Sequence, residues 1–150
     1  MLRLSKKMIF ALEAVVDIAY HAGSGPVQSK DITARQGIPQ RYLEQVMQRL
    51  VRAGILKGTR GPRGGYRLAR ERRRVTLGDV ARVVYDVEGG NGFEYPSESV
   101  LGRSVVAPLW RDLEETLMTR LDAVTIEDLC RHAREVGVGG DARAHLDFTI

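Results

Sequence analysis

The sequence contains few of the residues and patterns that mark several common classes of protein. Only one of its 150 residues is a cysteine, Cys130, which excludes an intramolecular disulfide framework and agrees with a reducing compartment. It has no run of about 18 apolar residues, as a transmembrane helix requires, and its first residues lack the apolar stretch of a signal peptide. Hydrophobic residues still make up 43% of the chain. We therefore expect a folded cytoplasmic protein that does not associate with a membrane.

Acidic residues are scarce in the first half of the chain. Residues 1–74 contain 16 Lys and Arg but only 5 Asp and Glu, whereas residues 75–150 contain 7 and 14. A basic half joined to an acidic half indicates one region that binds a polyanion and another that avoids it. An ordinary solvated surface of mixed charge would give similar counts. The charge pattern alone therefore suggests nucleic acid without establishing it.

Patterns typical of enzymes are also missing. His21, His132 and His145 are scattered and show no metal-ligand spacing. Serine, histidine and aspartate occur without a nucleophile elbow. The glycine-rich residues 61–65 are not followed by the Gly-Lys-Ser/Thr of a phosphate loop or by a dinucleotide fingerprint. We therefore expect neither catalysis nor a bound metal or cofactor.

Periodicity in the first third of the chain predicts three helices. Apolar residues spaced by three and four predict a helix over residues 5–21, and a short one over 30–36 with Ser29 as its N-cap. A turn at residues 37–39 leads into a third helix over residues 40–53. Its expected apolar stripe comprises Leu43, Val46, Met47, Leu50 and Val51. Its polar face carries Gln40, Arg41, Glu44, Gln45, Gln48, Arg49 and Arg52. Two helices joined by a short turn, the second with exposed amide and guanidinium groups, indicate a helix-turn-helix.

The next segment predicts an arginine-tipped hairpin. Residues 55–59 and 66–69 have the pattern of short strands, and the loop between them, residues 60–65, contains three glycines. Arg60 and Arg63 give this loop its charge. A hairpin of this kind directly after a helix-turn-helix is a wing. We expect a mainly α fold with a small β-hairpin wing, followed by a long C-terminal dimerisation helix.

The second half predicts further helices around a long loop. We expect helices over residues 76–85, from about 105 or 108 to 122, and over 125–135, with Thr76–Asp79 and Thr125–Asp128 as caps. Residues 109–121 carry an apolar stripe assigned to dimerisation: Leu109, Trp110, Leu113, Leu117 and Leu121. The expected units are a DNA-binding domain (1–85), a sensory or linker loop (86–104), dimerisation helices (105–136) and a flexible tail (137–150).

Three motifs together resemble one family. They are Tyr42-Leu43-Glu44-Gln45, Arg60-Gly61-Pro62-Arg63-Gly64-Gly65-Tyr66 and Leu109-Trp110-Arg111-Asp112-Leu113. The chain is similar to the Rrf2 family of winged-helix regulators, and most to its iron–sulfur cluster regulator (IscR) branch, over residues 1 to about 130. The resemblance implies a bacterial repressor or dual regulator that binds an imperfect palindrome in double-stranded DNA as a homodimer.

The resemblance also assigns DNA contacts to particular residues. It places the major-groove positions on Arg41, Glu44 and Gln45. Arginine can be bidentate to guanine and glutamine to adenine, and glutamate can accept from cytosine. It places the minor-groove wing arginine on Arg60 and sets Tyr42 against phosphates. The full expected DNA-binding set is Gln40, Arg41, Tyr42, Glu44, Gln45, Arg49, Arg60 and Arg63.

One departure from the family concerns its cluster. In this register the three cysteine positions of cluster-binding members fall on Gly92, Glu98 and Ser104, and the position three residues further on is Ala107. None of these can supply a thiolate, which an ordinary iron–sulfur cluster needs. We therefore expect a regulator without a cluster.

The sequence does not identify the signal that controls such a regulator. Phe93 and Tyr95 are candidate sensor residues in the long loop, which could equally be a linker. Cys130, expected to be buried, is an alternative as a thiol switch. The effector could be a small molecule or a metabolic enzyme. A less favoured alternative is a winged-helix module that binds RNA or protein.

Overall fold

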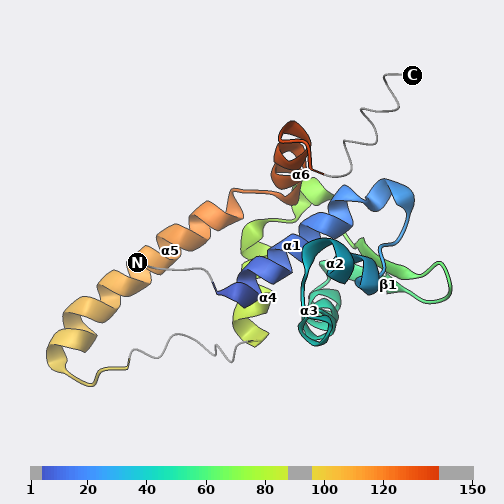
Figure 1. Ribbon diagram of the computed structural model, residues 1–150. Helices are drawn as coiled ribbons and strands as arrows, with labels where there is room; N and C mark the ends of the chain where they lie inside the picture. The colour runs from blue at the N-terminus through green and yellow to red at the C-terminus, as the bar shows by residue number, and fades with distance from the viewer. Residues whose placement is uncertain (1–4, 88–95, 139–150) are drawn as a thin grey trace.

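The chain forms a bundle of helices with a two-stranded hairpin at one end and a long helix at the other (Figure 1). This computed structural model describes residues 5–87 and 96–138. The helices are α1 (Lys6–Tyr20), α2 (Ser29–Gln36), α3 (Gln40–Arg52), α4 (Leu77–Val87), α5 (Ala107–Asp122) and α6 (Ile126–Glu135). The hairpin strands are β1 (Leu56–Thr59) and β2 (Gly65–Leu68), and short helical turns are η1 (Ala22–Ser24), η2 (Arg72–Arg74) and η3 (Gly102–Val106). The predicted fold class, mainly helical with a hairpin wing, is confirmed.

Helix α1 lies at the centre of the core. It packs against α2, α3, α4, α6 and β2. Its inward face combines the small Ala11 and Ala14 with the larger Val15 and Ile18, and all four are buried. Small residues let neighbouring helices approach, while the branched ones fill the space between them. The core therefore holds the helix-turn-helix, the wing and α6 together on one scaffold.

The helix caps largely follow the sequence signals. Ser5 Oγ accepts from the Met8 N–H at 3.1 Å, and the expected caps at the starts of α4 and α6 are present. The prediction for Ser29 is wrong, because Gln28 occupies the N-cap position and Ser29 is the first residue of α2. Val27 exchanges two backbone hydrogen bonds with Tyr66, of 2.9 and 2.8 Å, and this bridge fixes where the chain turns into the helix.

Helical structure resumes earlier than expected before α5. Val100 and Leu101 are already helical and continue through the π-helical turn η3 into α5, because Ser99 Oγ accepts from the Gly102 N–H at 2.9 Å. At the other end of the expected loop, residues 86 and 87 belong to α4. Residues 88–95 of that loop and residues 139–150 of the expected tail lie outside the described residues.

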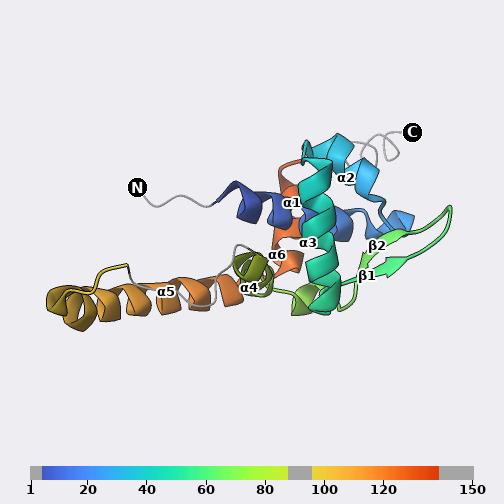
Figure 2. The same ribbon diagram turned by 90° about the horizontal axis from the view of Figure 1, so that it is seen from below.

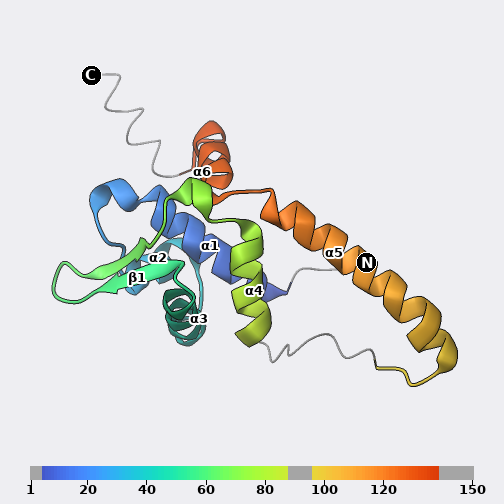
Figure 3. The same ribbon diagram turned by 180° about the vertical axis from the view of Figure 1, so that it is seen from behind.

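Helix α5 leaves the bundle as an arm, at the end of the molecule opposite the wing (Figures 2 and 3). It packs against α4, whereas α6 returns to lie against α1 and η2. Among the helices that the structure describes, none is long and apolar enough to cross a membrane.

Candidate nucleic-acid interface

The apolar stripe of α3 determines which of its side chains face outward. Leu43, Val46, Met47 and Leu50 are fully buried, as predicted. Val51 was expected in the same stripe, but it is 36% exposed because it lies about 100° around the helix from Leu50, at the edge of the stripe. All seven polar side chains predicted for the outer face are exposed: Gln40, Arg41, Glu44, Gln45, Gln48, Arg49 and Arg52.

The turn between α2 and α3 sets this orientation. Gly37 ends α2 in the left-handed conformation with φ of 66°, which glycine adopts without steric cost. The next residue, Ile38, is buried in the core, and this burial holds the turn between α2 and α3 in place. Pro39 then precedes the first turn of α3. The two helices therefore form the predicted helix-turn-helix, with the polar face of α3 directed to solvent.

One of the predicted DNA-binding residues, Gln40, holds α3 against α2 and also contacts a second one, Glu44. The Gln40 side-chain oxygen accepts from Thr33 Oγ1 at 2.9 Å, and its nitrogen donates to Glu44 Oε1 at 3.0 Å. The same nitrogen lies 3.4 Å from Ser29 Oγ. Gln40 therefore orients the carboxylate of Glu44 and braces the first turn of the helix.

Tyr42, expected to lie against phosphates, packs toward α1. Its hydroxyl donates to the Lys7 carbonyl at 2.7 Å, and its ring lies 5.9 Å from that of Phe10. The side chain is half-buried. In this structure Tyr42 positions α3 relative to the start of α1.

Five other residues of the predicted DNA-binding set are exposed and have no partner within the described residues. Arg41, Gln45, Arg49, Arg60 and Arg63 are exposed, and within the described residues none of their side chains makes a hydrogen bond or ion pair. Seven of the twelve arginines that the structure describes elsewhere are paired with carboxylates: Arg35, Arg70, Arg72, Arg73, Arg82, Arg131 and Arg134. Of the other five, Arg103 donates to the Glu98 carbonyl, and the side chains of Arg67, Arg74, Arg111 and Arg120 make no hydrogen bond or ion pair within the described residues. Uncompensated cations gathered on one surface attract a polyanion.

Glycines determine the shape of the wing loop. A Cβ atom at Gly64 would lie 2.2 Å from the Thr59 carbonyl oxygen, so no larger residue can occupy this position without moving the backbone. Gly65 has a φ of 149° and lies against the backbone of Val27, leaving no room for a side chain. Gln28 Nε2 donates to the Pro62 carbonyl at 3.3 Å. The loop that carries Arg60 and Arg63 is thus anchored to the segment before α2.

An open groove lies between α3 and the wing. Its volume is about 480 Å³, and its lining includes Gln48, Val51 and Arg52 from α3 and Thr59 and Arg60 from the hairpin. Gly58 and Gly65 contribute no side chain to narrow it. Gln48 and Arg52 were expected on the exposed face of α3 but not among the DNA-binding residues, because only the fold shows that they face the wing.

A buried carboxylate that the sequence did not reveal locks α1 to α2. The Asp17 side chain is fully buried, and Arg35 donates to it twice, at 2.9 and 2.7 Å. Gln36 Nε2 donates at 2.8 Å, and His21 Nδ1 lies 3.6 Å from the carboxylate. The hydrogen bond to Asp17 raises the pKa of Arg35. This cluster holds the first helix of the helix-turn-helix in place.

The apolar residues assigned to dimerisation fall into two groups. Leu109, Leu113 and Leu117 lie at four-residue intervals on α5, and each is at least half exposed. Trp110 and Leu121 are only partly exposed. Large apolar side chains in a row on a projecting helix form a continuous surface of the kind that marks a protein interface.

Of the three candidate sensor residues, the structure describes only Cys130. Phe93 and Tyr95 lie outside the described residues. Cys130 is buried in the core, as expected, and this burial raises the pKa of its thiol. A neutral, inaccessible thiol reacts slowly, which does not favour a thiol switch at this position.

A helix-turn-helix with an outward polar face, followed by a wing with unpaired arginines, defines a winged helix-turn-helix DNA-binding protein. The chain belongs to the Rrf2 family: residues 4–132 match the family described as "Iron-dependent Transcriptional regulator".

Individual relatives agree with this assignment. The chain is 34% identical over 138 residues to the HTH-type transcriptional regulator IscR of Xenorhabdus nematophila, covering 91% of this chain and 84% of the relative. The solved structure of T. potens IscR matches with a TM-score of 0.74 and 36% identity, over 92% of this chain and 93% of that one. CymR, the global cysteine regulator of B. subtilis, matches with a TM-score of 0.70 and 32% identity, over 88% and 98%. The protein is a DNA-binding transcriptional regulator of the Rrf2/IscR type, as the motifs predicted.

The family description refers to iron, which raises the question of whether the residues at the family's cluster positions can bind it. Gly92 lies outside the described residues, Glu98 and Ser104 are exposed, and Ala107 is buried. Cys130 is the chain's one cysteine and lies in the core on α6. Iron–sulfur clusters are held mainly by cysteine thiolates. This donor set does not fit a cysteine-ligated cluster.

Proposed function

We propose that the protein is a homodimeric repressor that binds a palindromic operator in the cytoplasm without a cysteine-ligated iron–sulfur cluster. The observation that supports this most strongly is the distribution of arginines. Those on the outer face of α3 and on the wing loop have no partner within the described chain, whereas seven of the twelve described elsewhere are paired with carboxylates. A surface with unpaired arginines of this kind attracts an anion from outside the protein.

The outer face of α3 would read base edges in the major groove. Arg41 has the geometry to bind guanine through two hydrogen bonds, and Gln45 can do the same with adenine. Glu44, oriented by Gln40, accepts from a cytosine amino group. These contacts specify sequence, because each base pair presents a distinct pattern of donors and acceptors there.

The wing and the groove beside it would hold the DNA backbone. Arg60 and Arg63 extend from the hairpin loop toward phosphates or the minor groove. Arg52 and Gln48 line the groove between α3 and the wing, where a sugar–phosphate strand passes if α3 enters the major groove. Such contacts fix the position of the protein but carry no sequence information.

Dimerisation through α5 would place two of these surfaces on one duplex. Leu109, Leu113 and Leu117 are each about half exposed, so burying them against a second copy contributes about half the value for full burial, roughly 0.8–1.5 kcal/mol for each side chain. A twofold dimer presents its two α3 helices to half-sites related by the same symmetry, so the operator is a palindrome. A dimer bound there excludes other proteins from the site, which is the basis for repression.

The direct test is selection of bound duplexes from a random pool by the full-length protein. We expect a palindromic motif whose half-sites are separated by about one helical turn or a multiple of it. Arg41→Ala should reduce its enrichment, and duplex DNA should outcompete RNA of the same sequence. Failure to enrich any motif, or equal competition by RNA, would refute sequence-specific DNA binding.

The cluster-free part of the proposal has a separate test. Protein purified without oxygen should be colourless and contain neither iron nor sulfide in stoichiometric amount. A brown protein with bound iron and sulfide would overturn this part and leave the DNA-binding proposal intact.

A further inference from the structure

The C-terminal end of α5 is joined to the start of α4 by backbone hydrogen bonds. The Leu77 N–H donates to the Val124 carbonyl at 2.9 Å, and the Ile126 N–H donates to the Val75 carbonyl at 2.8 Å. The two segments therefore pair as short antiparallel strands around the bridge between residues 76 and 125. The direction in which α5 leaves the bundle is set at this junction.

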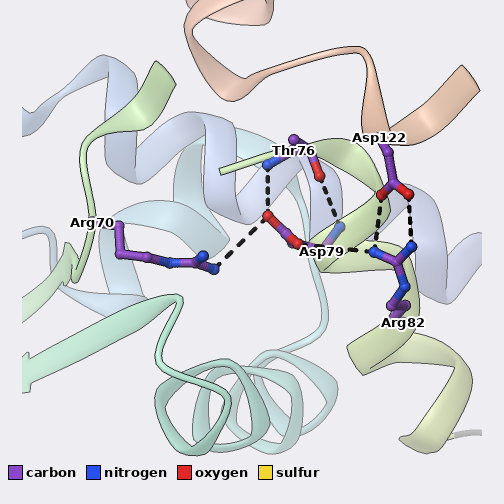
Figure 4. Close-up of polar contacts among 5 residues, drawn as sticks. All are labelled: Arg70, Thr76, Asp79, Arg82 and Asp122. Atoms are coloured by element: carbon purple, nitrogen blue, oxygen red, sulfur yellow. Dashed lines mark hydrogen bonds and ion pairs between the residues drawn. The ribbon is translucent and has the colours of Figure 1, made fainter. Parts of the chain in front are cut away.

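Charged side chains extend the junction toward the wing (Figure 4). Arg82 on α4 donates both terminal nitrogens to Asp122, the last residue of α5, at 2.9 and 2.7 Å. Arg82 also lies 3.9 Å from Asp79, which in turn lies 3.8 Å from Arg70, just beyond β2. The hydrogen bonds from Arg82 lower the pKa of Asp122, so this carboxylate stays ionised. A continuous path of charges thus links the end of α5 to the base of the wing.

Gly78 makes room for this ion pair. A Cβ atom at Gly78 would lie 1.8 Å from Asp122 Oδ1 and 3.2 Å from the Asp122 backbone nitrogen. The carboxylate therefore lies directly over the first turn of α4, where helix N–H groups favour negative charge. Any side chain at this position would push Asp122 away from Arg82.

The Arg82–Asp122 ion pair affects the direction of α5 more than it affects the stability of the fold. The Arg82 and Asp122 side chains are 54% and 39% exposed, and ion pairs in such surroundings add little to stability. A two-point contact between guanidinium and carboxylate does, however, restrict orientation. The 16 residues of α5 span about 24 Å. A rotation of about 10° at the fixed end moves the far end by about 4 Å, more than the rise of one base pair.

We propose that Arg82 and Asp122 are positioning residues that set the angle of α5 and thereby the half-site spacing that the dimer accepts. This inference rests on the proposed function as a dimer on a two-part operator. In this proposal Arg82 and Asp122 need no contact of their own with DNA or with the second copy. They act through the direction of the helix that joins the two DNA-binding units.

The experiment uses the full-length protein and a set of duplexes carrying the half-sites that the wild type selects, with spacers altered by one and two base pairs. Asp122→Asn removes the negative charge that pairs with Arg82 and keeps the shape of the side chain. Gly78→Ala displaces the carboxylate while favouring helix formation in α4. Arg131→Ala is the matched control, because it removes an exposed arginine–aspartate pair within α6 alone.

For the wild type we expect one preferred spacing. In Asp122→Asn and Gly78→Ala, the preference over spacers one base pair longer or shorter should fall by about threefold or more, whereas affinity for a single half-site stays within about twofold. Arg131→Ala should match the wild type. Circular dichroism and thermal melting establish that each variant is folded.

An unchanged spacing preference in folded Asp122→Asn and Gly78→Ala would overturn the inference. An equal loss of affinity for single half-sites and for every spacer would also overturn it, because that pattern reflects damage to the DNA-binding unit. If the wild type selects no two-part site, the proposed function itself fails, and this outcome is visible before any variant is made.

Discussion

Replacing Arg35 by alanine removes the main partner of the buried Asp17 carboxylate. The substitution breaks hydrogen bonds of 2.9 and 2.7 Å and leaves Gln36, at 2.8 Å, as the remaining strong donor. The carboxylate is fully buried, so water does not reach it in the folded protein. The variant therefore carries an uncompensated charge between α1 and α2.

The expected cost follows from this geometry. Removing one partner of a buried ion pair typically destabilises a protein by about 3–5 kcal/mol. The Arg35 side chain is 37% exposed, so its removal lets water approach, and Gln36 remains bound. We therefore expect a value near the lower limit, about 3 kcal/mol. For a protein of this size, the melting temperature should fall by about 6–12 °C.

Thermal and denaturant unfolding of three variants tests the reasoning. Arg35→Ala combined with Asp17→Asn should be more stable than Arg35→Ala alone, by about 1–2 kcal/mol, because the buried charge is gone. Arg73→Ala, which removes an exposed pair with Glu71, should remain within about 0.5 kcal/mol of wild type. A double variant no more stable than Arg35→Ala would refute the explanation by uncompensated charge.

Three further outcomes are expected. Leu113→Asp should give a folded monomer by light scattering that loses operator binding, because a carboxylate would be buried in the α5 interface; a stable dimer would contradict the assignment. Gly64→Ala should abolish specific DNA binding by deforming the wing at the Thr59 carbonyl, whereas Gly58→Ala, whose Cβ would meet nothing closer than 3.9 Å, should fold with its wing intact by NMR. Cys130 should resist alkylation at pH 8 until the protein unfolds, and rapid labelling of the native state would revive the thiol switch.

The elements that could be predicted are those with local signals. The stripe of α3, the paired runs around the glycine loop and the caps at Thr76 and Thr125 each depend on residues within a few positions of one another. These signals were sufficient for the helix-turn-helix and the wing. The Ser29 cap was misplaced because the start of α2 depends on a bridge between Val27 and Tyr66, far apart in the sequence.

The features that could not be predicted join distant parts of the chain. Asp17 meets Arg35 across 18 residues, and Arg82 meets Asp122 across 40. No periodicity or composition marks such pairs, because they exist only once the helices are packed. The same limit applies within the candidate site, where Tyr42 belongs to the predicted DNA-binding set but donates its hydroxyl to Lys7.

The central claim is that exposed side chains of α3 read the sequence of the operator. The most direct measurement is the affinity of wild type and Gln45→Ala for the selected operator and for a scrambled duplex at one salt concentration. This substitution removes no charge, so binding to the scrambled duplex should stay within about twofold. Affinity for the operator should fall by about 1–3 kcal/mol, roughly 5- to 150-fold, with relaxed specificity at one base pair in each half-site. Equal affinities of the two proteins for the operator, or an equal loss on both duplexes, would contradict the account.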